Sequence, residues 1–255
     1  MSNTKAAVWL ETRYDLNLAA LEDLGFGERE LGVEVPAFEE IRDSLCSENL
    51  DWLYERRMAG HRDELVISPS IQRIGLRLGE TALLPRFDYG SLRASRVSPA
   101  WNRFPNGDPT HDNGSEPWPV AILLGDVADP RDPAQPVNEY EEKGLVYTKM
   151  VATEQQKVVE DERSQHIASG RQLSHASIAE IVIVNAQRRQ AGIPMLDGRT
   201  YTRLVRYSGK RDIALFSKVI AVGRINDRLD LCEPFAFFRS RHIGMRRSLK
   251  IPIVK

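Results

Sequence analysis

The sequence predicts an α+β protein, because helical patterns and short strands occupy separate stretches of the chain. Apolar residues recur at helical spacing near the N-terminus and again in residues 174–190, whereas residues 200–255 hold short apolar runs separated by turn residues. Helices followed by a set of short strands are typical of the α+β class. With 255 residues, 42% of them hydrophobic and 28% charged, the chain has the composition of a folded globular protein.

Two helices are expected at the start of the chain. The first is residues 16–24 (LNLAALEDL), which Gly25 and Gly27 end. The second covers residues 37–59, where apolar residues recur on one side and residues 47–49 mark an irregularity. Its acidic start and basic end suit the helix dipole, which favours anions at the N-terminus and cations at the C-terminus.

Strands and long punctuated segments follow these helices. Residues 64–68 and 71–78 are predicted strands, residues 98–119 have loop composition, and residues 120–124 form a further strand. The stretch 126–138 (DVADPRDPAQPVN) is rich in proline and aspartate and marks a domain boundary. We therefore expect two parts, an N-terminal helix/strand region of unknown role (1–138) and a C-terminal domain (139–255).

The C-terminal domain is predicted to hold two helices and several strands. After a strand at 145–150, a polar helix covers 153–169, and a helix with a strongly apolar face covers 174–190. Ser174 is its predicted N-cap, which makes His175 a first-turn residue, and Gly192 and Pro194 end it. The remaining predicted strands are 200–207, 214–222, 228–231, 235–238 and 242–249.

Charge and cysteine content exclude several classes of function. The 35 Lys plus Arg balance 36 Asp plus Glu, so no global field attracts nucleic acid or an acidic membrane. Cys46 and Cys232 fit neither a metal-ligand spacing nor a disulfide framework.

Residues 1–17 lack the apolar core of a signal peptide, and no apolar run has the length of a membrane span. A cytoplasmic protein is expected, with surface display by another route left open.

The sequence contains no recognisable catalytic constellation. Its five histidines are scattered, and no His or Cys pair has the spacing of a metal site. Residues 75–79 (GLRLG) lack the third glycine of a dinucleotide loop, and there is no Gly-Lys-Ser/Thr phosphate loop. We therefore expect no cofactor, no metal and no enzymatic activity.

Aromatic and cationic side chains concentrate near the C-terminus. Within eight residues the chain holds three phenylalanines beside three basic residues, namely Phe235, Phe237, Phe238, Arg239, Arg241 and His242. The adjacent Phe237 and Phe238 point to opposite faces of a regular strand, which puts one of them outside. Aromatic and arginine side chains are the usual anchors of protein interfaces, so this segment favours a binding surface.

The order of motifs in residues 142–250 resembles a known family. These motifs are GLVYTK, a polar helix, LSHASIAEIVIVNAQRRQAGIPMLDGRTYTR, VIAVGRINDRLDL and IGMRRSL. A Thr-x-Thr-Arg-like strand (200–203), a Val-x-Val-Gly-like strand (220–223) and a closing Ile-Gly strand (243–247) are similar to those of variable proteins of diversity-generating retroelements from candidate-phylum bacteria and archaea. The resemblance leaves the first half of the chain unexplained.

This resemblance implies a C-type-lectin-like fold in residues 139–255, with two helices and short antiparallel strands, whose last strands display side chains diversified by adenine-directed reverse transcription. The implied partner is a protein or cell-surface ligand of unknown identity. The expected ligand contacts are Asn226, Asp227, Arg228, Cys232, Phe235, Phe237, Phe238, Arg239, Arg241 and His242. The expected fixed scaffold is Gly223, Leu229, Leu231, Ile243, Gly244 and Met245. The Glu-Pro-Asn and Trp-Asn-Asp calcium motifs of sugar-binding lectins are absent, so calcium-dependent sugar binding is not expected.

Two alternatives remain open at the level of sequence. A nucleic-acid-binding protein would use the basic segment 239–250, with cations on phosphates and phenylalanines stacked on bases. Its affinity would fall steeply with salt. An enzyme of unrecognised type would need a concave pocket lined by acid or base groups with perturbed pKa values.

Overall fold

The computed structural model describes the helices and most strands that the sequence predicts. Its described residues are 2–23, 34–45, 47–68, 120–125, 145–146, 150, 153–155, 157–158, 161, 164, 172–176, 178–193, 196, 201–204, 220–225, 228–232, 243–251 and 253. The helices are α1 (Ser2–Asp23), α3 (Phe38–Ser44), α4 (Ser47–Met58) and α7 (Ile178–Gln190). The strands are β1 (Glu64–Ile67), β2 (Val120–Leu123), β3 (Leu145–Val146), β4 (Gln172–His175), β5 (Tyr201–Leu204), β6 (Ile220–Ile225), β7 (Arg228–Cys232) and β8 (Ile243–Ile251).

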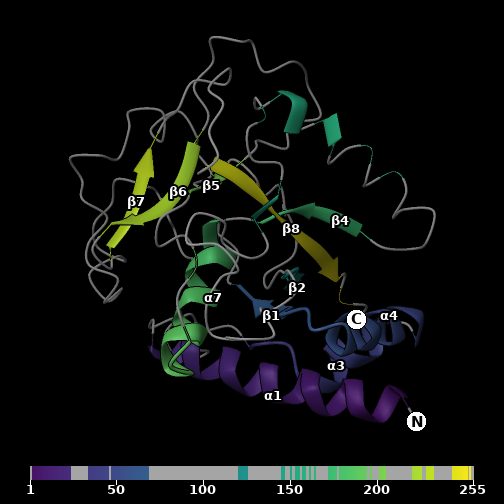
Figure 1. Ribbon diagram of the computed structural model, residues 1–255. Coiled ribbons are helices and arrows are strands. Elements are labelled where there is room, and N and C mark those ends of the chain that lie inside the picture. The colour runs from purple at the N-terminus through teal and green to yellow at the C-terminus, as the bar shows by residue number, and fades with distance from the viewer. Residues whose placement is uncertain are drawn as a thin grey trace.

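The long strand β8 joins the strands into one sheet. The sheet order is β1-β2-β8-β5-β6-β7, and β3 and β4 also pair with β8. Only the β5–β8 pairing is parallel among the described strands, and the others are antiparallel. Figure 1 shows β8 crossing the molecule, with β5, β6 and β7 on one side of it and α1, α3 and α4 on the other. The predicted α+β class is confirmed, and the C-type-lectin-like fold stays a prediction.

Helix α1 is longer than the sequence predicted because its buried stripe starts earlier. Ala6, Leu10, Asn17 and Leu21 are buried, and their spacing places them along one face of the helix. Glu11 and Asp15, which interrupt the apolar pattern after residues 6–10, are exposed and lie outside this stripe. The prediction of a helix limited to residues 16–24 was therefore too short.

The second predicted helix consists of two helices. Leu45 is extended (φ −90°, ψ 107°) and ends α3, and α4 begins at Ser47. Leu45 is also buried, so the break turns its side chain into the core. The helix begins with a hydrogen bond from the Ala37 N–H to the Glu40 carboxylate (2.9 Å), which satisfies one unpaired backbone donor. The predicted irregularity at residues 47–49 lies two residues after the observed break.

The prediction of a helix beginning at Ser174 is wrong. Residues 172–175 form β4, in which Ser174 pairs with Ser248 and His175 pairs with Arg247 of β8. Helix α7 starts only at Ile178, so Ser174 is not its N-cap and His175 is not a first-turn residue. Pairing with β8 outweighs the local capping signal, because tertiary contacts override weak helix propensity.

The other strand predictions have mixed outcomes. Strands β1, β2, β5, β7 and β8 overlap their predicted ranges, and β6 runs past the predicted end at Val222 to Ile225. Leu145 and Val146 of the predicted strand 145–150 form β3, whereas Met150 is not in a strand, and the described residues of the predicted helix 153–169 are helical. The predicted strands 71–78 and 235–238 and the predicted loops 98–119 and 126–138 lie outside the described residues.

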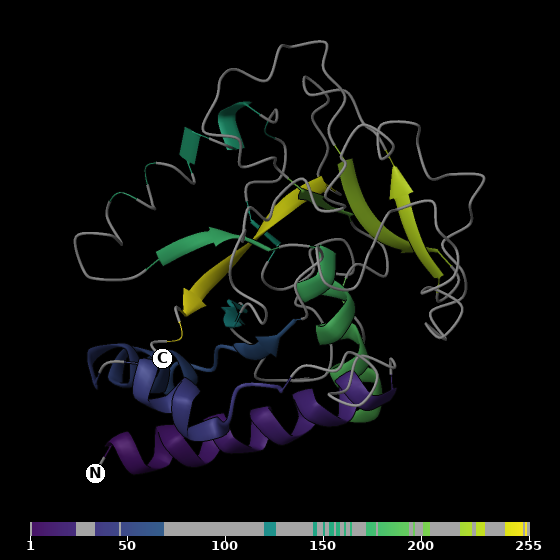
Figure 2. The ribbon, with the colours of Figure 1, turned by 180° about the vertical axis from the view of Figure 1, so that it is seen from behind.

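Helices α1 and α7 cover β1 at one end of the sheet. Helix α1 contacts α4, α7 and β1, and α7 also contacts β1. Figure 2 shows α1 along the base of the molecule and α7 rising from it toward the strands. One hydrophobic core joins residues from both halves of the chain, including Leu10, Ile67, Ile122, Ile181 and Leu249. The boundary predicted near residue 138 stays a prediction, but β1 and β2 before it share a sheet with β8 after it.

Candidate functional site

Two of the predicted ligand contacts fall within the described residues. Arg228 is the first residue of β7 and Cys232 is its last. The remaining predicted contacts, Asn226, Asp227, Phe235, Phe237, Phe238, Arg239, Arg241 and His242, lie outside the described residues. The predicted binding surface therefore stays a prediction, and the structure describes the strands on either side of it.

These strands tie both ends of the predicted surface to one sheet. In the β6–β7 pair, Ile225 is opposite Arg228 and Ala221 is opposite Cys232. After residues 233–242 the chain continues into β8, where Ile243 is opposite Tyr201 of β5. The predicted scaffold residues Gly223, Leu229, Leu231, Ile243, Gly244 and Met245 all lie in strands. Met245 is fully buried, as a fixed scaffold position requires.

Two cations of β8 face internal partners. Arg246 is only 1% exposed, and its Nε donates a hydrogen bond to Thr202 Oγ1 of β5 (3.0 Å). Lys250 pairs with Glu180 of α7, whose carboxylate is fully buried. Both lie in the basic segment 239–250 that the nucleic-acid alternative would use. In the structure, Arg246 links β8 to β5, and Lys250 links β8 to α7.

A repeated local motif, which the sequence analysis missed, ends both α4 and α7. The chain reads RRMAGH at residues 56–61 and RRQAGI at 188–193. Each glycine has positive φ (87° at Gly60, 65° at Gly192), and the next residue donates its N–H to the first arginine carbonyl (2.9 Å and 2.8 Å). This is the Schellman motif, in which glycine adopts the left-handed conformation after the last helical turn. The repeat Arg-Arg-x-Ala-Gly was the signal that could have been found in the sequence.

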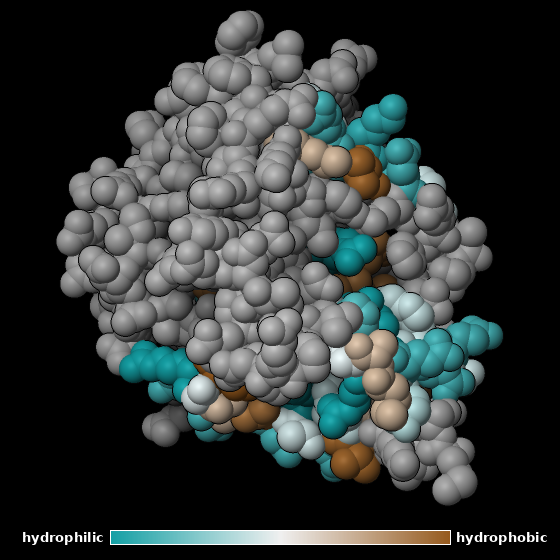
Figure 3. Space-filling view, viewed as in Figure 1, coloured by the Kyte–Doolittle hydropathy of each residue, from teal (hydrophilic) through white to brown (hydrophobic). Residues whose placement is uncertain are grey.

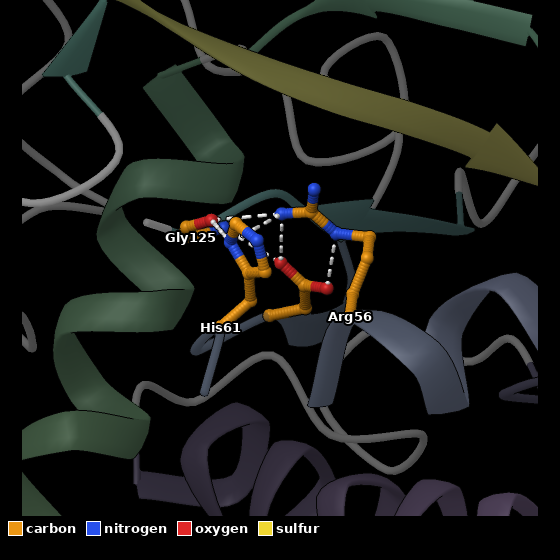
Figure 4. A network of polar contacts seen from close by, with 4 residues as sticks. Arg56, His61 and Gly125 are labelled. Carbon is orange, nitrogen blue, oxygen red and sulfur yellow. Dashed lines mark hydrogen bonds and ion pairs between the residues drawn. The ribbon is translucent and has the colours of Figure 1, made fainter. Parts of the chain in front are cut away.

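The first motif holds a polar network at the start of β1 (Figure 4). Arg56 binds the buried carboxylate of Asp63 through two hydrogen bonds, Nε to Oδ2 (2.7 Å) and Nη2 to Oδ1 (2.8 Å). The Gly125 N–H donates to Asp63 Oδ1 (2.8 Å), and the Gly125 carbonyl accepts from Arg56 Nη2 (2.8 Å). A Cβ at Gly125 would lie 1.9 Å from the Arg62 carbonyl oxygen, so only glycine fits.

His61 completes this network from the end of the turn. Its Nδ1 is 3.0 Å from the Gly125 carbonyl oxygen and 3.3 Å from Arg56 Nη2. Donation to the carbonyl requires the proton on Nδ1, which leaves Nε2 as the acceptor nitrogen. Within the described ranges, however, no three His, Cys, Asp or Glu side chains gather as a metal site needs. The contacts of the network are directed inward, where they fix the junction of α4, β1 and β2.

The second motif repeats the arrangement on the adjacent carboxylate. Arg188 Nε is 2.6 Å from Glu64 Oε1, and both side chains are largely buried (13% and 6% exposed). The neighbouring Gln187 donates from Nε2 to the Leu65 carbonyl (3.0 Å) and to Asn17 Oδ1 (2.6 Å). The consecutive residues Asp63 and Glu64 at the start of β1 thus each form an ion pair with the first arginine of one motif.

Arg13 of α1 lies beside this second pair. Burial lowers its pKa most, Glu64 raises it, and the nearby charges of Arg57, Arg188 and Arg62 lower it further. Burial and like charges both disfavour the protonated form of a base, whereas an adjacent carboxylate favours it. Burial is thus the main cause of the lowered pKa of Arg13.

The described surface carries no broad hydrophobic area in the view of Figure 3, where hydrophobic residues are scattered among hydrophilic ones. Val8 and Met58 are the large hydrophobic residues exposed in the described part of the chain. None of the described helices combines the length and hydrophobicity needed to cross a bilayer.

Comparison with known proteins identifies no relative. No protein-family model, no curated protein and no solved structure matches the chain.

Proposed function

We propose that the protein binds a protein or cell-surface ligand through residues 226–242, as a diversified surface on a C-type-lectin-like scaffold. The observation that carries the proposal is the anchoring of this segment at both ends. Ile225, just before the segment, is paired in β6, Ile243, just after it, is paired in β8, and both strands belong to one sheet. Segments held between rigid strands tolerate sequence change and commonly carry binding residues.

The burial of β8 supports a division between a fixed and a variable part. Gly244, Met245 and Arg246 are buried, and Ile243 and Gly244 pair with β5. Substitution at these positions would disturb packing or leave buried polar groups unpaired. Variation is therefore expected before residue 243 and not after it.

Part of the basic segment that a nucleic-acid-binding protein would use faces the interior of the protein. Phosphate contacts require exposed cations, because binding releases counterions from the nucleic acid. Arg246 is buried against Thr202, and Lys250 pairs with Glu180. Protein binding is thus the better-supported use of the C-terminal segment.

Randomisation of two sets of codons tests the proposal. One library varies Phe235, Phe237, Phe238, Arg239 and Arg241, and a matched library varies five scaffold positions, Leu229, Leu231, Ile243, Gly244 and Met245. Most members of the first library are expected to stay folded by protease resistance, and folded members are expected to yield binders to arbitrary immobilised proteins. Equal loss of folding in both libraries would contradict a variable surface on a fixed scaffold.

A further inference from the structure

Strand β5 connects the two ends of segment 226–242 within the sheet. The segment follows β6, which pairs with β5, and it is followed by β8, which also pairs with β5. In the strand order of the described residues, β5 therefore lies between β8 and β6. Figure 1 shows β5, β6 and β7 together on one side of β8. The position of one end of the segment relative to the other thus depends on how β5 meets β8.

The junction of β5 with β8 is short. Its paired residues are Tyr201 with Ile243 and Thr202 with Gly244, in parallel orientation, whereas β5 pairs with β6 over its whole length. Parallel pairing is slightly less stable per residue than antiparallel pairing. A shift of one residue in this ladder would place the side chains of β5 on the opposite face relative to β8. The few backbone pairs of the junction thus hold its register weakly.

A buried hydrogen bond between two side chains strengthens this junction. Arg246 is two residues after Gly244 in β8, so Arg246, Gly244 and the paired Thr202 share one face of the sheet. Arg246 Nε donates to Thr202 Oγ1 (3.0 Å), and the two residues are 1% and 0% exposed. A hydrogen bond from a charged donor is roughly twice as strong as a neutral one. This bond joins β8 to β5 beside their paired residues.

The backbone of Arg246 is itself held by two neighbouring segments. Arg246 pairs with Leu145 of β3, and its carbonyl accepts a hydrogen bond from the Ala176 N–H just after β4 (2.9 Å). Met245, the preceding residue, is fully buried. These contacts fix Arg246 in the part of the sheet outside β5, β6 and β7. Its side chain therefore reaches β5 from a fixed position.

Stability alone does not account for a buried arginine at this position. Apolar residues of similar volume often replace buried charged groups without loss of stability, and the best-attested use of such groups is to select one register. We propose that Arg246 and Thr202 are positioning residues, which hold β5 on β8 in one register and thereby fix the two ends of segment 226–242 relative to each other. A surface held in its binding geometry loses less entropy when a ligand binds. The role in binding rests on the proposed function, whereas the role in register does not.

Hydrogen exchange of the full chain, followed by mass spectrometry, tests the Arg246–Thr202 pair without a ligand. Thr202→Val keeps the shape of the side chain and removes its hydroxyl, whereas Thr202→Ser keeps the hydroxyl. We expect Thr202→Val to speed exchange in β5, β6 and β7 by roughly tenfold and to leave β1 and β2 unchanged, because one part of a structure can open separately from the rest. Thr202→Ser should exchange at nearly the native rate.

Thr12→Val is the matched control. It makes the same change at an exposed threonine, whose hydroxyl donates to the Val8 carbonyl of its own helix (3.0 Å). It should leave exchange in β5, β6 and β7 at the native rate. Equal acceleration in all strands of Thr202→Val, or no acceleration in β5, β6 and β7, would overturn the proposal.

A binding assay tests the consequence for the ligand surface. A member of the library at residues 235–241 is selected against immobilised lysozyme, and the Thr202 and Thr12 substitutions are introduced into it. Thr202→Val is expected to raise the Kd for lysozyme roughly tenfold, mainly through faster dissociation, and Thr202→Ser to restore it. An unchanged Kd beside faster exchange would overturn the positioning role. A library without binders would instead contradict the proposed function, so the two failures are distinguishable.

Discussion

The side chain of Asn17 forms both hydrogen bonds that a neighbouring strand would offer to Ile67. Its Nδ2 donates to the Ile67 carbonyl (3.2 Å), and its Oδ1 accepts from the Ile67 N–H (2.9 Å). Gln187 caps the Leu65 carbonyl on the same edge of β1. Because β1 ends the sheet order, two buried amides from α1 and α7 cover an edge that would otherwise expose unpaired backbone groups.

Asn17→Leu keeps the volume of the side chain but removes both bonds to Ile67. Each buried backbone group left unpaired costs about 1–3 kcal/mol, so we expect a loss of about 2–6 kcal/mol in the free energy of unfolding for the two groups of Ile67. Urea denaturation followed by circular dichroism measures it. Asp15→Asn, exposed on the same helix, is the control. A loss below about 1 kcal/mol for Asn17→Leu would show that the edge does not need this amide.

Arg56→Ala leaves Asp63 buried without its bidentate partner. Removing one partner of a buried ion pair costs about 3–5 kcal/mol, because an uncompensated charge stays in the interior. The matched control is Arg42→Ala, whose pair with Asp43 is solvent-exposed and contributes at most about 1 kcal/mol. Chemical denaturation of both variants makes the comparison, and similar losses in the two would contradict the buried network.

Gly125→Ala and Gly192→Ala are predicted to differ in cost. A Cβ at Gly125 would meet the Arg62 carbonyl at 1.9 Å, whereas a Cβ at Gly192 meets nothing within 4 Å and only strains a positive φ of 65°. We expect about 1–2 kcal/mol for Gly192→Ala, the cost of a left-handed conformation, and a larger loss for Gly125→Ala. Differential scanning calorimetry of the two variants measures both losses of stability. A larger loss for Gly192→Ala than for Gly125→Ala would contradict the close approach at Gly125.

Lys250→Met removes a salt-bridge partner of the fully buried Glu180. The single variant should lose about 3–5 kcal/mol, whereas the double variant Glu180→Leu/Lys250→Met should recover most of that loss, because apolar residues replace a buried pair at little cost. Denaturation of the native protein, both single variants and the double variant forms a complete cycle. Additive losses would show that the two residues do not interact.

The sequence predicts the fold class and most strands because their signals are local. Alternating and helical apolar patterns indicate β1, β2, β8 and the body of α7 without knowledge of their partners. Ser174 shows the limit of this reasoning, since its capping signal is local but its pairing with Ser248 is not. The early start of α1 was missed for a related reason, because Glu11 and Asp15 interrupt the apolar pattern in the sequence although both are exposed outside the buried stripe.

The polar junction could be predicted only in part. Arg-Arg-x-Ala-Gly is visible twice in the sequence and indicates two helix ends. That both ends meet at Asp63 and Glu64 depends on contacts between residues more than 120 positions apart, as in the Arg188–Glu64 pair. The burial of Glu180 and Gln187 on α7 likewise depends on partners on other elements, which the local sequence does not indicate.

Deep sequencing of this gene in the natural population that carries it tests the central claim most directly. The codons for residues 224–242 are compared with those for α7, which serve as the internal control. The account predicts substitutions concentrated at adenine-derived positions before residue 243, with the α7 codons unchanged. Equal and low variation in both windows would contradict a diversified binding surface.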